Sequence, residues 1–372
     1  MNQRIIVALA IVAGAVLSGV PAATQQASIP TFQVDPYFPK PLPNAWTFGW
    51  VAAVFVDARD HIWLLHVPSS LSQWEDGAGT DPPRSLCCKA APPVVEFDQD
   101  GNVVQSWGGP GQGYDWPATE HALYIDHKDH VWISSSDNAE GQVLKFTRDG
   151  QFLMQIGKKT KGAGSNDTTS LGGPAGIVVD PQTNEVIIAD GYVNRRVIVF
   201  DADTGAYKRH WGAYGETPDD GPYAYDPDQP LPRQMQAVHC INQSSDGLLY
   251  VCDRGSNRLQ VFQRDGTFVS EAQIQPRTRG GAGTTDGIAF SRDAEQQFLY
   301  VADGGNHRVW ILRRSDLQIL GSFGQGGHHT GGFIAPHMLG LDSKGNMYVG
   351  ESVDGRRIQR FVYTGMSAAE SN

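Results

Sequence analysis

The chain has 372 residues, of which 40% are hydrophobic and 19% are charged, so it can bury a sizeable core. Its formal net charge is −11 at pH 7, and no cluster of Lys and Arg stands out against the acidic residues. This balance argues against nucleic acid and anionic membranes as partners. The 43 glycines and 22 prolines, without long helical periodicity, favour short strands joined by many turns.

The first 23 residues have the pattern of a secretory signal peptide. Arg4 precedes an apolar run at residues 5–20, and Val20, Pro21 and Ala22 supply small residues for a cleavage site. A membrane anchor is the alternative, but Ala and Gly make the run weakly hydrophobic and no second apolar span follows. We therefore expect an exported protein, periplasmic or secreted, that is free of the membrane after cleavage.

Six related segments follow along the chain, and each reads as a strand, a polar turn and a second strand. The clearest is EHALYIDHKDHVWI at residues 120–133. In five of the six segments, a bend leads to a third strand, and a hairpin, usually of the DG or TG type, opens a fourth. The sixth segment stops after its third strand, at residues 356–362. A lone strand at residues 31–38 can complete it.

This repeat predicts an all-β fold, a six-bladed β-propeller closed by an N-terminal strand. Closure with both termini removes the exposed edges that a stack of blades would leave. The propeller domain is expected over residues 29–365, with a disordered tail at residues 366–372. A seven-bladed ring with an unrecognised blade in residues 67–92 is the alternative. That segment contains Pro and Gly but no paired strand pattern, which favours a long loop.

A second repeat lies in the bends after the second strands, where a carboxylate precedes an Arg and an aliphatic residue. The pairs are Asp190 and Arg196, Asp253 and Arg258, Asp303 and Arg308, and Glu351 and Arg357. Because the pair recurs from blade to blade, we expect it to be a structural ion pair that links strands, not a catalytic group.

The four cysteines suit an oxidising compartment. Cys240 and Cys252 flank a turn on paired strands, which makes a cross-strand disulfide plausible. Cys87 and Cys88 are adjacent in sequence, and a vicinal disulfide, two thiols or metal ligation are all compatible with that spacing.

One position of the inner strands carries the chemistry. We name it the hub position, five residues before the Asp, or its equivalent, that ends each inner strand. In blade order the hub residues are Ala52, His121, Ala175, His239, Asp286 and His337. Inner strands line the central channel, so histidines from alternate blades should converge on the axis. Three His ligands with a fourth position left open suit catalytic Zn²⁺, with Cu²⁺, Fe²⁺ or Co²⁺ as alternatives.

These residues also carry a family resemblance. The chain resembles NHL-repeat propellers, and more narrowly the catalytic domain of peptidyl-α-hydroxyglycine α-amidating lyase and its exported bacterial relatives. The resemblance covers most of residues 50–361. Its carriers are EHALYID around His121, VHC around His239, APHML around His337, ADGYVNRRVIVF at residues 189–200 and VCDRGSNRLQVF at residues 251–262. The resemblance implies that the three histidines bind catalytic zinc and that the tyrosine of the DGY motif, Tyr192, acts at the metal.

Tyr192 and Arg254 are the candidate catalytic residues. Tyr192 lies in the bend of the third blade, between the blades that bear His121 and His239, so its phenol can act as a general base or acid at the metal. A rim tyrosine that packs between loops is the alternative. Arg254 lies in the matching bend of the fourth blade, where it can hold a substrate carboxylate or, equally, pair with a loop.

Two positions depart from the pattern of the lyase family. The family's substrate-binding arginine in the first blade is absent, and the matching place is His66-Val67. Met338 follows the third histidine, where the family has an Asp that helps to hold calcium. Both changes weaken the expectation of peptide amidation itself and of bound Ca²⁺. The loop at residues 67–92 is expected over the same mouth of the channel, and His328 and His329 are expected to be exposed.

The leading hypothesis is an exported zinc-dependent lyase that cleaves a small carbinolamide-like substrate into an amide and an aldehyde. Metal-dependent hydrolysis of an ester, lactone or amide is the second hypothesis. The third is a non-catalytic propeller that binds a ligand or a protein, with histidines that fill the channel.

Overall fold

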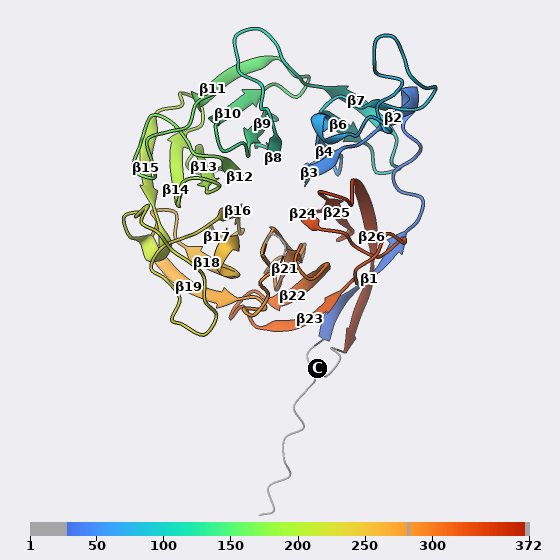
Figure 1. Cartoon of the computed structure of the whole chain (residues 1–372). Coiled ribbons are helices and arrows are strands. Elements are labelled where there is room, and N and C mark those ends of the chain that lie inside the picture. The colour runs from blue at the N-terminus through green and yellow to red at the C-terminus, as the bar shows by residue number, and fades with distance from the viewer. Residues whose placement is uncertain (1–27, 281–282, 369–372) are drawn as a thin grey trace, which may run out of the picture.

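The computed structural model describes residues 28–280 and 283–368, and the predicted signal peptide lies outside them. Six four-stranded antiparallel sheets surround a central channel (Figure 1). The predicted six-bladed propeller is confirmed. Within the described part of the chain, no helix is long and apolar enough to cross a membrane.

Each blade runs from an inner strand at the channel to an outer strand at the rim. Blade 1 contains β3 (Trp50–Val56), β4 (Ile62–Val67), β6 (Val94–Phe97) and β7 (Val103–Trp107). Blade 2 contains β8 (Glu120–Ile125), β9 (Val131–Ser135), β10 (Gly141–Phe146) and β11 (Phe152–Lys158). Blade 3 contains β12 (Pro174–Asp180), β13 (Glu185–Asp190), β14 (Arg196–Asp201) and β15 (Tyr207–Trp211).

The second half of the ring repeats this plan. Blade 4 contains β16 (Val238–Gln243), β17 (Leu249–Asp253), β18 (Arg258–Phe262) and β19 (Phe268–Gln273). Blade 5 contains β20 (Gly287–Phe290), β21 (Phe298–Asp303), β22 (Arg308–Arg313) and β23 (Ile319–Phe323). Blade 6 contains β24 (Pro336–Leu341), β25 (Met347–Glu351), β26 (Arg357–Ala368) and β1 (Ser28–Asp35).

The middle strands are apolar on both faces because each blade is packed between two others. All six residues of β4 and all six of β13 are buried, whereas β15 at the rim is largely exposed. Between blades 4 and 5, for example, Tyr250 and Val261 pack against Ile288 and Trp310. The core of the protein is therefore a set of apolar layers between neighbouring blades.

The N-terminal strand closes the ring, as the sequence predicts. β1 pairs antiparallel with β26 and forms the outer edge of blade 6, and Arg360 Nε donates to Asp35 Oδ2 at 2.9 Å. The predicted end of the chain needs a correction. β26 continues to Ala368, so residues 366–368 belong to a strand because β1 offers them a pairing partner, with Ser28 opposite Ala368.

The segment after β4 is a loop, not a seventh blade. It contains the short 3-10 helix η2 (Pro68–Ser70), and its strand β5 (Lys89–Ala90) pairs in parallel with β2 (Trp46–Thr47) outside the six blades. Three further 3-10 helices are short: η1 (Pro43–Ala45), η3 (Ala213–Gly215) and η4 (Arg254–Ser256).

Both cysteine pairs are joined. Cys240 on β16 and Cys252 on β17 form the expected cross-strand disulfide, with their Cα atoms 4.9 Å apart. Cys87 and Cys88 form a vicinal disulfide in the loop after β4. Of the three states that the sequence left open for this pair, the structure shows the disulfide.

Three of the four predicted bend pairs form. The carboxylate and guanidinium contacts are 2.9 Å for Asp190 and Arg196, 2.7 Å for Asp253 and Arg258, and 2.7 Å for Glu351 and Arg357. The prediction is wrong for Asp303, which accepts a hydrogen bond from the Trp310 indole at 2.7 Å. Trp310 brings an N–H donor to the carboxylate, and the Arg308 guanidinium instead lies over the Trp310 ring.

We predict that the closing strand contributes measurably to the stability of the whole ring. The Phe32 ring lies 5.0 Å from that of Phe323 and 5.7 Å from that of Tyr300, across the seam between blades 5 and 6. Phe32→Ala should lower the free energy of unfolding by about 2 kcal/mol, because it leaves a partial cavity there. Chemical denaturation measures this loss. Tyr37→Ala is the control: Tyr37 is 77% exposed, and its loss should change stability by less than about 0.5 kcal/mol. Equal effects of the two variants would contradict this role of β1.

Candidate metal centre

Five of the six hub residues lie at irregularities of the inner strands, and the sixth, Asp286, directly precedes β20. The pairing register with the second strand shifts at Ala52, Ala175 and His337, and also across the stretches that contain His121 and His239. An extra residue in a strand is left out of the ladder and re-aims its side chain. At the hub this turns the side chain toward the channel axis and leaves the carbonyl free for another partner.

The three hub histidines converge, as the sequence predicts. Their ring centroids form a nearly equilateral triangle with sides of 4.8, 5.0 and 4.9 Å. One nitrogen from each of His121, His239 and His337 lies within 4.8 Å of the other two. All three side chains are buried.

Each imidazole is held by the next blade around the ring. His121 Nδ1 lies 2.8 Å from the carbonyl oxygen of Ala175, His239 Nδ1 2.7 Å from that of Asp286, and His337 Nδ1 2.7 Å from that of Ala52. The acceptors are therefore the hub residues of the three blades that carry no histidine. A carbonyl oxygen only accepts, so Nδ1 must carry the proton and Nε2 must be the free base.

A glycine next to one acceptor permits this close approach. A Cβ atom on Gly287, which follows Asp286, would lie 2.3 Å from the carbonyl oxygen of His337. Because that neighbour is backbone, an alanine there would push blades 5 and 6 apart at the hub.

Burial keeps the imidazoles neutral. It lowers the pKa of His121 and of His239 well below the usual value, with a further contribution from neighbouring cationic groups. Burial likewise lowers the pKa of His337 to about 4. Neutral imidazoles are the form that binds a metal.

The geometry fits a tetrahedral metal ion. The Nε2 atoms of His239 and His337 are 3.2 Å apart. Two nitrogens that each lie about 2.0–2.1 Å from a tetrahedral Zn²⁺ would be about 3.3 Å apart. Without a cation between them, two unprotonated nitrogens at this distance would turn their lone pairs toward each other. The group could therefore hold a metal, and the Nδ1–H···O=C bonds are the partners that metal-binding histidines usually have.

Tyr192 reaches this centre from the bend between β13 and β14. Its hydroxyl lies 2.9 Å from His121 Nε2 and 3.3 Å from His239 Nε2. Since Nε2 is unprotonated, the phenol donates to His121. Burial raises the pKa of Tyr192, and the Arg254 guanidinium opposes that rise. The side chain thus contacts the histidines and is not a tyrosine at the rim.

Arg254 begins η4 and places its guanidinium 5.4 Å from the centre of the Tyr192 ring. Its side chain is 14% exposed, and its closest carboxylate contact is Asp286 Oδ1, 3.4 Å from Nη1. A guanidinium has five N–H donors, so most of them remain available for a ligand.

Asp286 belongs to the site, although the sequence indicated only that it occupies the hub position. Its carbonyl orients His239, and its carboxylate contacts Arg254 and accepts a hydrogen bond from the Gly304 amide at 2.8 Å. Burial raises the pKa of Asp286 to about 6, and Arg254 opposes that rise. Its signal in the sequence was that it is the one hub residue that is neither Ala nor His.

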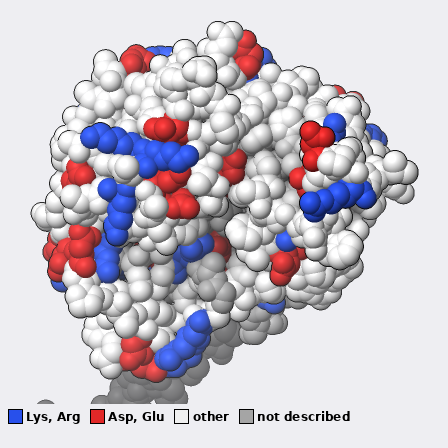
Figure 2. All heavy atoms as spheres, turned by 45° about the horizontal axis from the view of Figure 1, so that its top comes forward, with Lys and Arg blue, Asp and Glu red and all other residues white. Residues whose placement is uncertain are grey.

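The centre opens into a cavity of about 600 Å³ on the face formed by the bends. His121, His337, Tyr192, Arg254 and Asp286 line its floor and one side. Such a volume suits a small molecule. Figure 2 shows acidic and basic side chains interspersed over the face of the described chain that it presents.

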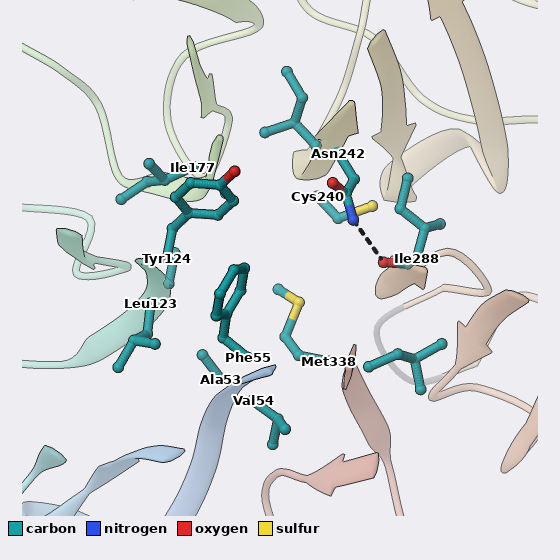
Figure 3. A pocket seen from close by; sticks show the side chains of 14 residues that line it. Ala53, Val54, Phe55, Leu123, Tyr124, Ile177, Cys240, Asn242, Ile288 and Met338 are labelled. Atoms are coloured by element: carbon teal, nitrogen blue, oxygen red, sulfur yellow. Dashed lines mark hydrogen bonds between the residues drawn. The ribbon is translucent and has the colours of Figure 1, made fainter. Parts of the chain in front are cut away.

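The channel on the other side of the histidines is narrow and mostly apolar. Figure 3 shows Phe55, Tyr124 and Met338 pointing toward one another there, and the remaining space is only about 70 Å³. The rings of Phe55 and Tyr124 meet edge to face, 4.9 Å apart. Among the described residues that line this space there is no carboxylate. Met338, where the lyase family has an Asp, thus brings no carboxylate to this space.

The cavity lining includes a fourth histidine, His307, but not His66, His328, His329 or the long loop after Val67. His66 is fully buried and its ring contacts backbone groups of Gly49 and Ala91, and burial lowers its pKa to about 4. His328 and His329 are exposed, as expected. Val67 lines the cavity, but no residue of 68–92, all of which the structure describes, does so. Glu75 of this loop contacts Arg356 in the bend of blade 6, so the loop lies on the predicted face, but it does not line the cavity.

A second group of ligand-type residues is already neutralised. Asp57, His61 and Glu96 lie close together, but the Arg148 guanidinium contacts both carboxylates, with its Nη2 2.7 Å from Asp57 Oδ2. This arginine occupies the place that a cation would take, so the cluster is a structural network.

Comparisons with known proteins agree with this architecture. No protein-family model matches the chain. It is similar to a peptidyl-glycine alpha-amidating monooxygenase of Mus musculus, with 25% identity over 315 residues that cover 82% of this chain and 29% of the relative. The Xenopus laevis monooxygenase B is 27% identical over 237 residues, 62% of this chain and 25% of that protein. The chain thus spans less than a third of the length of these relatives.

NHL repeat-containing protein 3 of Homo sapiens is 24% identical over 279 residues, 73% of this chain and 73% of that protein. A solved structure of a streptogramin B lyase matches with a TM-score of 0.52 and 12% sequence identity, over 90% of this chain and 98% of that one, which concerns the fold alone. Together with the six-bladed ring, these relatives identify the fold as an NHL-type propeller. The distant similarity to the monooxygenases supports an enzyme.

We predict that removal of one hub imidazole eliminates metal binding without unfolding the ring. His239→Ala should reduce bound metal from one ion per chain to a trace, as measured by elemental analysis of protein reconstituted with Zn²⁺. His328→Ala, which alters an exposed histidine, should retain the full amount. The circular dichroism spectra of both variants should match that of the parent. Unchanged metal content in His239→Ala would disprove the metal centre.

Proposed function

We propose that this protein is an exported, metal-dependent lyase that cleaves a small hydroxylated, carbinolamide-like substrate, with zinc as its metal. One observation carries the proposal: three Nε2 atoms with fixed tautomers meet a phenol at the floor of an open cavity, with a guanidinium beside that phenol. The similarity to amidating monooxygenases supports this reaction class. The two disulfides, together with the N-terminal pattern, support export.

His121, His239 and His337 would hold the metal. When bound, zinc supplies a Lewis acid with one open position, which lowers the pKa of a hydroxyl placed there. The carbonyls of Ala175, Asp286 and Ala52 keep the three Nε2 atoms directed at that point.

Tyr192 would move the proton. In a carbinolamide, the hydroxyl and the amide nitrogen share one carbon. The phenol oxygen accepts the hydroxyl proton while the phenol's own proton passes to the leaving nitrogen. The C–N bond breaks with its electron pair on nitrogen, and the O–H electrons form the carbonyl. An amide and an aldehyde result, and no water is consumed.

Arg254 would orient a substrate that carries a carboxylate. Its remaining N–H donors can bind both carboxylate oxygens, which fixes the rotation of the adjacent carbon. Asp286 positions the guanidinium through its contact at 3.4 Å. The hydroxylated carbon is thereby held beside Tyr192 and the three Nε2 atoms.

We predict that Tyr192→Phe retains metal but loses turnover. Loss of a general acid–base group should lower kcat by about 10²- to 10⁴-fold, while elemental analysis still finds full zinc occupancy. The assay is aldehyde release from N-acyl-α-hydroxyglycines by zinc-reconstituted protein. Tyr207→Phe, at an exposed rim position, should keep the parental rate. Full activity in Tyr192→Phe would remove this residue from the mechanism.

We also predict that the reaction takes no oxygen from solvent. In ¹⁸O-labelled water, the amide product should remain unlabelled, because elimination consumes no water. The aldehyde exchanges its oxygen with water and must therefore be trapped as it forms. Label in a carboxylic acid formed from the acyl group would instead establish a hydrolase, because hydrolysis of the acyl–nitrogen bond puts one oxygen of water into that acid. Zinc occupancy without turnover of any α-hydroxyglycine compound would keep the metal site and reject the lyase.

A further inference from the structure

The cavity over the metal centre has two chemically different sides. Arg254 and Tyr192 line one side, from the bends of blades 4 and 3. The other side comes from blades 1 and 6, where a group of apolar residues lies beside Ser352 and Asp354. We name it the apolar wall, and it consists of Trp50, Val67, Ile334 and Val353. In a six-bladed ring blade 1 lies opposite blade 4, so the hub histidines stand between the two sides (Figure 1).

Two residues of the apolar wall are fixed by strand pairing. Trp50 begins β3 and lies directly opposite Val67, the last residue of β4. The Trp50 amide donates to Ser70 Oγ at 2.8 Å, so the backbone there is held from both directions. Trp50 is nevertheless 37% exposed, and its side chain adjoins the cavity. A rigid aromatic surface of this kind contacts a ligand at low entropic cost.

Val353 is in an unusual backbone conformation. Its φ is +48°, in the left-handed region that β-branched residues rarely adopt, and it is 46% exposed. Hydrogen bonds from the Ser352 amide to the Ala335 carbonyl and from the Gly355 amide to the Ser352 carbonyl hold the bend. Strain at an exposed apolar residue gives nothing to folding, and such strain is concentrated at ligand sites.

The charges of the cavity favour one anionic group in its ligand. Arg254 is the one Lys or Arg among the described residues that line it, whereas Glu120, Asp286 and Asp354 also line it. Asp354 follows Val353 directly, so a second anion on this side would meet a carboxylate. A ligand that spans the cavity would therefore place its carboxylate at Arg254 and an uncharged group at the apolar wall.

We propose that the apolar wall is an acyl-binding subsite, and that the substrates are monoanionic N-acyl-α-hydroxy acids with an aromatic or branched aliphatic acyl group. The inference rests on the proposed lyase function for the reacting carbon, and it adds the identity of the group attached to its nitrogen. In this arrangement the substrate carboxylate lies at Arg254, the hydroxylated carbon at the histidines and the acyl group at Trp50.

The test is equilibrium binding of analogues that lack the hydroxyl and cannot react. Isothermal titration of the zinc-loaded full chain with N-phenylacetylglycine and N-acetylglycine compares ligands that differ by one phenyl group. Burial of that group should make the first bind about 10- to 100-fold more tightly. N-succinylglycine should bind at least about 10-fold more weakly than N-butyrylglycine, since they differ chiefly in a second carboxylate. Equal affinities within the first pair would overturn the subsite.

Two variants localise the effect. Trp50→Ala should reduce the preference for phenylacetyl over acetyl by about 10-fold and leave the affinity for N-acetylglycine unchanged. Trp74→Ala is the matched control, because Trp74 is 84% exposed on the loop outside the cavity and its loss should change neither affinity. Val353→Gly relieves the left-handed strain, so its thermal midpoint should stay level or rise while the preference falls. A preference unchanged in both cavity variants would disprove the assignment.

Turnover separates this inference from the proposed function. If phenylacetyl is preferred in binding but N-phenylacetyl-α-hydroxyglycine is not cleaved, the subsite stands and the lyase proposal fails. If that compound and its acetyl counterpart are cleaved with equal kcat/KM and the analogues bind equally, the lyase stands and the subsite fails.

Discussion

Three hydrogen bonds between blades determine what this propeller can do. Each runs from the Nδ1 of a hub histidine to the hub carbonyl of the next blade. They link the inner strands of all six blades in pairs, and they also fix the tautomer in which every Nε2 is a free base. The same bonds therefore serve packing and chemistry. At Ala52 and Ala175 the acceptor carbonyl lies at an irregularity of the inner strand, which takes that residue out of the ladder.

The scaffold around the hub keeps these bonds in place. β1 closes blade 6, so the ring has no free seam at which His337 could move away from Ala52. The buried pairs of Asp190 with Arg196 and of Asp253 with Arg258 anchor the bends that carry Tyr192 and Arg254. Blade 5 lacks this ion pair, because the Trp310 indole donates a hydrogen bond to the Asp303 carboxylate instead. Structural ion pairs and site residues are thus neighbours on the same short bends.

The two ends of the channel differ in size and chemistry. Phe55, Tyr124 and Met338 fill the channel below the histidines, and burial raises the pKa of Tyr124 to about 12, so its phenol stays neutral. The larger cavity opens on the face of the bends, where blade 4 offers a cation and blades 1 and 6 offer apolar side chains.

The sequence alone determined the architecture and the three convergent histidines. The blade repeat sets both the strand order and the hub position, and residues at equal positions of a closed ring must lie at equal heights in its channel. It also predicted that Tyr192 reaches the histidines and that Cys240 lies opposite Cys252. These are local or repeated features, for which spacing along the chain is sufficient.

Only the tertiary structure decided the rest. The acceptors of the three Nδ1–H groups, the double role of Asp286 and the apolar wall opposite Arg254 all depend on contacts between different blades. So does the extension of β26 to Ala368, which requires β1 as a partner. Such contacts join residues far apart in sequence, and their geometry follows from strand irregularities and packing that no periodic pattern records.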